Sequence, residues 1–195
     1  MTLYVVGLDL SLTAPGVAGA RGGTPVVDTI AIPARLRDIP RIDHICAQVL
    51  AWTLGADLVV MEGYAPGSQR AGLQSGVDER AGLRWIIKRE IVHAGIPFVE
   101  ISPSKLKKFA TGKGNASKHE MTVAAVRRFV DVEFGDDNQV DATWLCAAGS
   151  QWLGNPLVSL PKAQVEVLEA VGHLPMMEEP KDSAQRYRQF LETLP

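Results

Sequence analysis

The first third of the chain alternates between short apolar runs and turn residues. Apolar and β-branched residues dominate 3–10, interrupted by one carboxylate, Asp9, and the run ends before the turn at Pro15-Gly16. Two more short runs follow over 17–20 and 25–32, separated by a pair of glycines. Runs of this length joined by tight turns predict three consecutive antiparallel strands.

From residue 39 the period of the pattern changes to that of a helix. Apolar side chains recur three and four positions apart over 39–54, and Gly55 is placed to end the helix. The short apolar run 57–62 then ends on a second acid, Glu62. Because a helical crossover separates 57–62 from the first strand, we expect these two strands to pair in parallel.

The rest of the pattern predicts helices and one further strand. We expect helices over 77–94 and 102–110, a strand over 97–101, and two helices that start near Ser117 and Asp136. Ser117 and Glu120 have the spacing of a capping box. Together the elements predict an α/β fold whose five-stranded mixed sheet has three antiparallel strands followed by two parallel ones, flanked by helices.

The helix over 77–94 is expected to bury its apolar side chains and expose its basic ones. The residues placed inward are Leu83, Ile86, Ile87 and Val92, and those placed outward are Arg80, Arg84, Lys88 and Arg89.

Composition is that of an ordinary globular protein, with 195 residues of which 46% are apolar and 22% charged. No apolar run reaches the roughly 18 residues of a membrane span, and the start of the chain lacks the pattern of a signal peptide. Cys46 and Cys146 lie in apolar helical patterns, which indicates buried thiols in a reducing compartment. We therefore expect a cytoplasmic protein.

Charge is distributed unevenly along the chain, although the net charge is only -2. Residues 66–128 hold twelve Lys or Arg against five Asp or Glu, and the remaining residues hold eight against seventeen. This asymmetry suggests a basic face that suits a polyanion, with ordinary solvated helix faces as the alternative.

Acidic residues stand where an unpaired charge is costly. Asp9 and Glu62 each lie at the end of an apolar strand, and parallel pairing would bring them to adjacent carboxyl ends, where ligands bind such sheets. Asp137 and Asp141 are four residues apart and share one helical face. Each acid alone could be a turn or helix cap. Together they suit two Mg²⁺ or Mn²⁺ ions and the in-line hydrolysis of a phosphodiester.

Four segments occur in the order of a known family. They are Gly-Leu-Asp-Leu-Ser at 7–11, Val-Met-Glu at 60–62, the lysine- and glycine-containing stretch 107–118, and Asp-Asn-Gln-Val-Asp-Ala at 137–142. Over roughly residues 3–153 the chain resembles RuvC-type Holliday junction resolvases of the ribonuclease H-like superfamily, and more loosely their divergent phage branch. The resemblance implies a ribonuclease H-like nuclease domain over 1–157, followed by a helical extension over 158–195.

The resemblance also implies an activity and its cofactor. It predicts a structure-selective endonuclease that uses two Mg²⁺ ions, replaceable by Mn²⁺, to nick four-way junctions or other branched DNA as a homodimer in a bacterial or phage-infected cell. Asp9, Glu62 and Asp141 match the family's metal-binding catalytic carboxylates. Lys107 and Lys118 match lysines near the scissile phosphate, with Lys118 counted among the catalytic residues.

The chain departs from the family pattern three residues before Asp141. The family has an acid or a histidine there, and this chain has Asn138. We favour Asp137 as the fourth metal ligand and catalytic acid, with the carbonyl oxygen of Asn138 as the alternative. Tyr64 is the candidate for an aromatic residue that stacks on bases, or else a tyrosine at the rim with no partner.

Further DNA contacts are assigned to basic residues. They are Arg70, Lys107, Lys113 and Lys118.

Other functions stay open at this point. A catalytically weak protein that binds branched DNA would share the same fold and basic face. An actin-like ATP-binding fold also starts with Gly-x-Asp, but it needs further glycine-rich phosphate loops that this chain lacks. A purely structural α/β domain would have to accommodate Asp9 and Glu62 on apolar strands without a cation.

Overall fold

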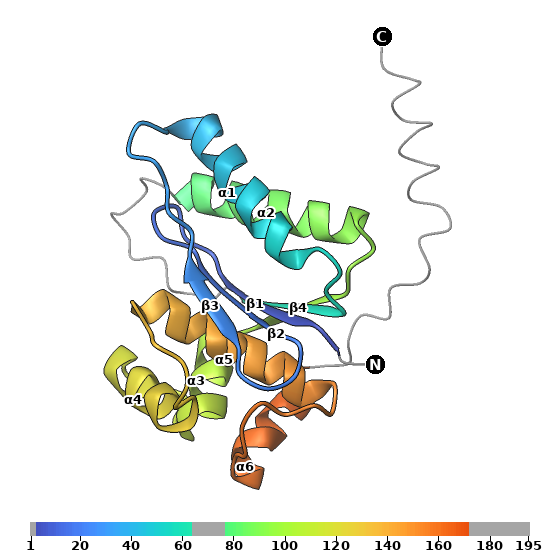
Figure 1. The fold of residues 1–195 in the computed structure, drawn as a ribbon, viewed down its shortest axis with the longest axis vertical. Coiled ribbons are helices and arrows are strands. Elements are labelled where there is room, and N and C mark those ends of the chain that lie inside the picture. Colours follow the sequence, from blue (N-terminus) through green and yellow to red (C-terminus); the bar gives the residue numbers. More distant parts are fainter. Residues whose placement is uncertain (1–2, 64–76, 172–195) are drawn as a thin grey trace.

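A five-stranded sheet divides the molecule into two helical layers (Figure 1). The computed structural model describes residues 3–63 and 77–171. The strands lie in the order β3-β2-β1-β4-β5, in which β1, β2 and β3 pair antiparallel and β1, β4 and β5 pair in parallel. The predicted mixed sheet is therefore confirmed. The strands are β1 Val5–Asp9, β2 Gly16–Ala20, β3 Val26–Thr29, β4 Leu58–Glu62 and β5 Phe98–Ile101.

Helices cover both faces of the sheet, as Figure 1 shows. Two of them, α1 and α2, lie on one face, and α3, α4 and α5 lie on the other. The helices are α1 Asp38–Thr53, α2 Val77–His93, α3 Pro103–Thr111, α4 Lys118–Arg128, α5 Asp137–Trp152 and the short α6 Lys162–Val165, which leads into a 3-10 turn over Glu166–Val171.

Alternation along the strands divides the core into two clusters. Leu8 and Met61 point toward α1 and α2, where they pack with Ile87. Val5 and Val60 point the other way, toward α5. Since successive side chains of a strand face opposite sides, this assignment also decides where the acids at the strand ends point.

α5 lies unusually close to the sheet because both surfaces have glycines at the contact. A Cβ atom at Gly7 would lie 2.1 Å from the carbonyl oxygen of Ala142 and 2.4 Å from the amide nitrogen of Cys146. At Gly149 it would lie 2.6 Å from Cγ2 of Val60. The glycines therefore let the backbones of α5 and the sheet approach each other closely.

α2 differs from its predicted orientation. Its buried residues are Leu83, Ile87 and Ile91, whereas Ile86 is 37% exposed. Placing Ile86 inward was wrong, because the buried side chains of α2 recur every four residues and form a narrow stripe that does not include Ile86. Placing Arg84 and Lys88 outward was also wrong, since both side chains contact Glu100 of β5.

The helix ends follow the predicted local chemistry. Ser117 accepts a hydrogen bond from the amide of Glu120 while the Glu120 carboxylate accepts one from the amide of Ser117, which completes the capping box. Asp136 caps α5 by accepting from the amide of Gln139. Cys46 and Cys146 are buried free thiols, as expected.

The end of the described chain packs against the same core. Leu168 belongs to the cluster that contains Leu106 of α3. The proposed domain boundary at residue 157 stays a prediction, and residues 172–195 of the expected helical extension lie outside the described residues. Within 3–63 and 77–171 we find no helix that combines the length and apolar character of a membrane span.

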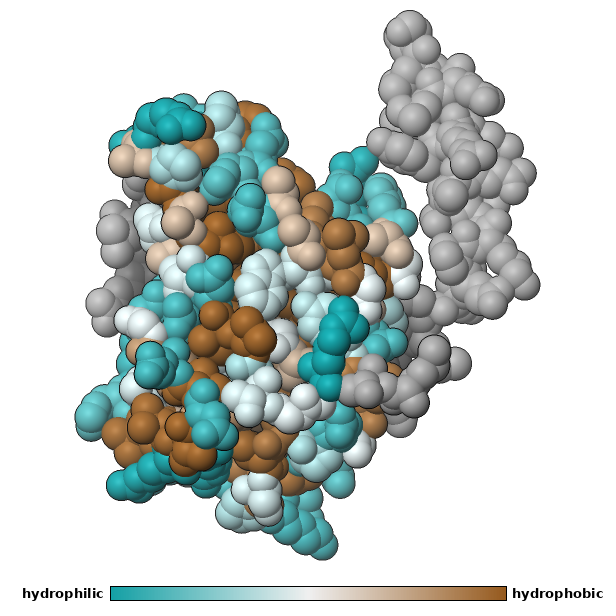
Figure 2. Space-filling model, in the orientation of Figure 1, coloured by the Kyte–Doolittle hydropathy of each residue, from teal (hydrophilic) through white to brown (hydrophobic). Residues whose placement is uncertain are grey.

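Apolar side chains on the surface are scattered. On the face shown in Figure 2, apolar patches are separated by hydrophilic residues. Trp85 on α2 is the largest of these exposed apolar side chains in the described residues, and it is 70% exposed.

Candidate active site

Asp9 and Glu62 end two neighbouring parallel strands. β1 and β4 pair in register up to Leu8 and Met61, so the next residues on each strand stand side by side at the carboxyl edge of the sheet. Gly7 faces α5, and Asp9, two positions later, shares that face. The same alternation carries Glu62 to the α5 side.

The first two turns of α5 bring the other acids to this edge. Gly16, the β2 partner of Asp9, has no side chain, and a Cβ there would lie 2.1 Å from the carbonyl oxygen of Asn138. The start of α5 can therefore rest on the end of β2 beside Asp9. Asp137 stands in the first turn of α5 and Asp141 one turn later on the same side.

The electrostatics of the four carboxylates show that they interact. Burial, followed by the nearby charges of Glu62 and Asp141, raises the pKa of Asp9 from 3.8 to about 7. Burial is also the main reason that the pKa of Asp141 rises to about 6 and that the pKa of Glu62 is raised. These groups resist ionising together, which is the condition that a bound cation relieves.

Lys118 provides a positive charge beside these carboxylates. It occupies the first turn of α4 and forms an ion pair with Asp137, with side chains 70% and 40% exposed. The pair lowers the pKa of Asp137, and the charge of Lys118 also acts to lower the pKa values of Asp9, Glu62 and Asp141. Its ammonium group thus lies within electrostatic range of all four acids.

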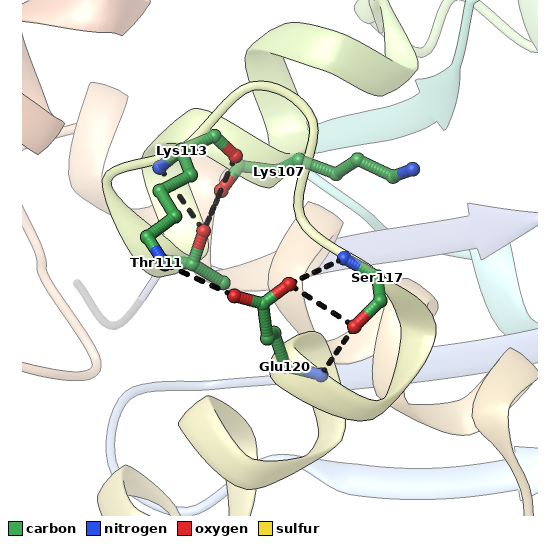
Figure 3. A network of polar contacts seen from close by, with 5 residues as sticks. All are labelled: Lys107, Thr111, Lys113, Ser117 and Glu120. Carbon is green, nitrogen blue, oxygen red and sulfur yellow. Dashed lines mark hydrogen bonds and ion pairs between the residues drawn. The ribbon is translucent and has the colours of Figure 1, made fainter.

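Two other lysines from the predicted set point in different directions (Figure 3). The charge of Lys107 on α3 acts to lower the pKa values of Glu62 and Asp141, so it lies on the side of the acids. Lys113 in the turn after α3 instead forms a 3.1 Å ion pair with Glu120 of the capping box. The structure therefore brings Lys107 and Lys118 to the acids, while Lys113 lies beside the N-terminus of α4.

Arg84 is a residue at this site whose position the sequence did not predict. It donates a 2.6 Å hydrogen bond to the carbonyl oxygen of Glu62 and a 2.5 Å bond to the carboxylate of Glu100. The helical pattern of α2 gave no sign of this contact, because Arg84 stands at a position typical of a solvated side chain. The one available signal was Glu100, an acid on the edge strand β5 that needs a positively charged partner.

Tyr64 and Arg70 lie outside the described residues. Their assignment to DNA contacts stays a prediction.

Comparison with known proteins identifies the fold. No family model matches the sequence, and no curated protein does. RuvC of Thermus thermophilus superposes with a TM-score of 0.61 at 17% identity, over 78% of this chain and 98% of RuvC. The chain has the RuvC fold. The same RuvC in complex with a Holliday junction substrate gives 0.60 at 18% identity, over 78% and 97% of the two chains. The yeast mitochondrial Holliday junction resolvase Ydc2 gives 0.50 at 13%, over 98% and 84%.

Within this RuvC fold the acidic edge of the sheet has the chemistry of a site for hard cations. All four candidate ligands are carboxylates, whose oxygens suit Mg²⁺ or Mn²⁺. In the described part of the chain, no three His, Cys, Asp or Glu side chains form a group arranged to hold an ion as they stand. The ion pair with Lys118 occupies Oδ2, one of the two carboxylate oxygens of Asp137.

Proposed function

We propose that the protein is a divalent-metal-dependent endonuclease that nicks Holliday junctions or other branched DNA. The observation that carries the proposal is the convergence of Asp9, Glu62 and Asp141 at one sheet edge, where burial, with a further contribution from neighbouring carboxylates, raises all three pKa values. The RuvC fold supports DNA as the substrate, because the similar solved structures are Holliday junction resolvases and one has the junction bound.

The acids have the role of holding Mg²⁺ in this proposal. Asp9, Glu62 and Asp141 would bind two ions, with Mn²⁺ as a substitute, and Asp137 rather than Asn138 would complete the set. When bound, such ions supply hydroxide at neutral pH and neutralise the leaving oxygen of a phosphodiester. Asp9, on the α5 side at the end of β1, would be a principal ligand of these ions.

The lysines of the site bind and orient the phosphate. Lys118 would exchange its contact with Asp137 for a nonbridging oxygen of the scissile phosphate, which frees Asp137 and places a positive charge where negative charge develops. Lys107 would contact the same phosphate from α3. Lys113, together with Tyr64 and Arg70, would contact the DNA further from the reacting bond.

A homodimer fits both the substrate and the surface. A four-way junction has two equivalent strands to cut, which a two-fold pair of active sites would match. Trp85, 70% exposed on α2, supplies the kind of large aromatic side chain that is enriched at protein interfaces. We further propose that 1–157 forms the nuclease domain, 158–195 a helical extension, and that the protein works in the cytoplasm of a bacterial or phage-infected cell.

The direct test is cleavage of a synthetic four-way junction. The purified protein should nick the junction with Mg²⁺ or Mn²⁺, leave it intact in EDTA, and cut a linear duplex of the same sequence far more slowly. Light scattering on the same sample should give about twice the 21.1 kDa mass of one chain. A protein that binds the junction tightly but leaves it intact with either metal would refute the nuclease proposal.

A junction-binding protein without efficient catalysis is the second candidate. It is favoured by Asn138 at the position where the family has an acid or a histidine, and by the lack of a ready ion-binding group among the described residues. Titration with Mn²⁺ separates the two candidates. A competent site should bind two ions per chain, whereas a vestigial site should bind one or none.

Replacing Lys118 with alanine should reduce the cleavage rate more than junction binding. We expect a loss of about 100-fold in single-turnover rate, since a charge that stabilises the transition state is removed, and a change in Kd of about threefold or less, since one exposed phosphate contact is lost. Lys108→Ala on α3 provides a control for a lost exposed lysine and should change neither quantity much. Equal losses in rate and binding would reduce Lys118 to a simple phosphate contact.

A further inference from the structure

Arg84 joins three elements behind the acidic edge of the sheet. From α2 it donates to the carbonyl oxygen of Glu62 at the end of β4 and to Oε1 of Glu100 on β5. Lys88, one turn later on α2, donates to Oε2 of the same Glu100 at 2.6 Å. The Arg84 and Lys88 side chains are only 19% and 16% exposed, so these contacts are shielded from solvent.

The contact reaches Glu62 from the face opposite to its carboxylate. Met61 belongs to the core cluster under α1 and α2, and Glu62, the next residue, points to the α5 side. Glu100 pairs with Met61 across the β4–β5 ladder and meets Arg84 on the α2 side. Arg84 thus holds the backbone of Glu62 from behind the sheet and leaves the carboxylate oxygens available on the other side.

The strand pairing of β4 ends at this point. The β4–β5 ladder pairs residues only as far as Glu62 with Ile101, and the amide of Gly63 then donates to the Ile101 carbonyl at 2.6 Å. A guanidinium group on the Glu62 carbonyl therefore adds an anchor at the end of the strand, where the position of the carboxylate depends on the position of the backbone.

We propose that Arg84, fixed by Glu100, is a positioning residue for the metal site: it clamps the backbone of Glu62 so that the carboxylate is held ready for a divalent ion. The proposal rests on the proposed function, since it assigns Glu62 to an ion. Both hydrogen bonds come from Nη2, whose two N–H groups lie in the plane of the guanidinium, whereas the ammonium of a lysine is tetrahedral and stands on a side chain one bond shorter.

The experiment compares two variants that remove one positive charge each from the same cluster. Arg84→Gln loses the contact with the Glu62 carbonyl, and Lys88→Gln keeps it while still weakening the hold on Glu100. Mn²⁺ binding is measured by calorimetry on the full chain, with thermal melting in EDTA as the measure of stability. We expect Arg84→Gln to weaken Mn²⁺ binding roughly tenfold and Lys88→Gln to weaken it about twofold or less, although both lower the melting temperature. Arg84→Lys should recover little of the affinity.

The outcomes separate this proposal from the proposed function. If wild-type protein binds Mn²⁺ and cuts junctions, but Arg84→Gln binds Mn²⁺ as the wild type does, the positioning role is wrong and the nuclease stands. Equal losses of Mn²⁺ affinity in Arg84→Gln and Lys88→Gln would assign the effect to general charge or stability and would also overturn the positioning role. A wild-type protein that binds no Mn²⁺ and cuts no junction overturns both proposals.

Discussion

Replacing Asp9 with asparagine should abolish junction cleavage while leaving junction binding within a few-fold of wild type. Asp9 is expected to hold the metal ions, and an amide supplies one neutral oxygen where a carboxylate supplies two oxygens that share a negative charge. We expect single-turnover cleavage in Mg²⁺ to fall by at least about 1,000-fold, which corresponds to about 4 kcal/mol of transition-state stabilisation. Binding measured in Ca²⁺ or EDTA should persist, because phosphate contacts from lysines dominate affinity.

Thermal melting in EDTA shows whether the Asp9→Asn variant is folded. In the metal-free protein the pKa of Asp9 is raised from 3.8 to about 7, so the folded state binds a proton that the unfolded chain has already lost. Wild-type stability should therefore fall as pH rises from about 4 to about 7. The asparagine side chain carries no charge at any of these pH values. The variant should therefore be the more stable protein at pH 8, by on the order of 2 kcal/mol, and should match wild type near pH 4.

A matched control for this result is Asp131→Asn, which alters an exposed acid after α4. It should cut and melt as wild type does. Retained cleavage by Asp9→Asn would remove Asp9 from the mechanism. An Asp9→Asn protein that melts below wild type at pH 8 would instead show that the carboxylate is stabilised by a partner in the fold.

Replacing Gly7 with alanine should prevent stable folding. The added Cβ would lie 2.1 Å from the Ala142 carbonyl oxygen and 2.4 Å from the Cys146 amide nitrogen, both backbone atoms of α5. No side-chain rotation relieves such an overlap, so α5 must move away from β1. We expect a loss of more than about 3 kcal/mol and a fall in melting temperature of roughly 10 °C or complete unfolding, measured by circular dichroism.

Gly82→Ala on α2 is the control for the loss of a glycine. A Cβ there meets no atom within 4 Å, and alanine is the better helix former by about 1 kcal/mol. This variant should be as stable as wild type or slightly more so. A folded Gly7→Ala protein with wild-type melting would show that α5 does not lie against the sheet at backbone distance.

Much of the fold could be predicted because it depends on patterns within single elements and on one topological rule. Short apolar runs with tight turns predicted β1 to β3, and the crossover through α1 predicted the parallel pairing of β4. That pairing was enough to place Asp9 and Glu62 at one edge. The capping box at Ser117 likewise followed from spacing alone.

The predictions that failed concern which face of an element meets which neighbour. The pattern of α2 contains apolar residues on more than one side, so it could not show that Ile91 is buried and Ile86 exposed. Arg84 and Lys88 have the spacing of surface residues. Their partner, Glu100, belongs to a strand reached only after the end of α2, and a periodicity within one helix carries no information about such a partner.

The sequence by itself determined the order and type of the elements, the strand ends on which the acids stand, and the helix face shared by Asp137 and Asp141. Only the tertiary structure decided how close α5 approaches, that Lys118 pairs with Asp137, and that Arg84 supports the backbone of Glu62. The physical reason is the distance along the chain over which each interaction acts. Periodicity and capping act over a few residues, whereas these contacts join segments that meet only when the sheet and its two helical layers pack together.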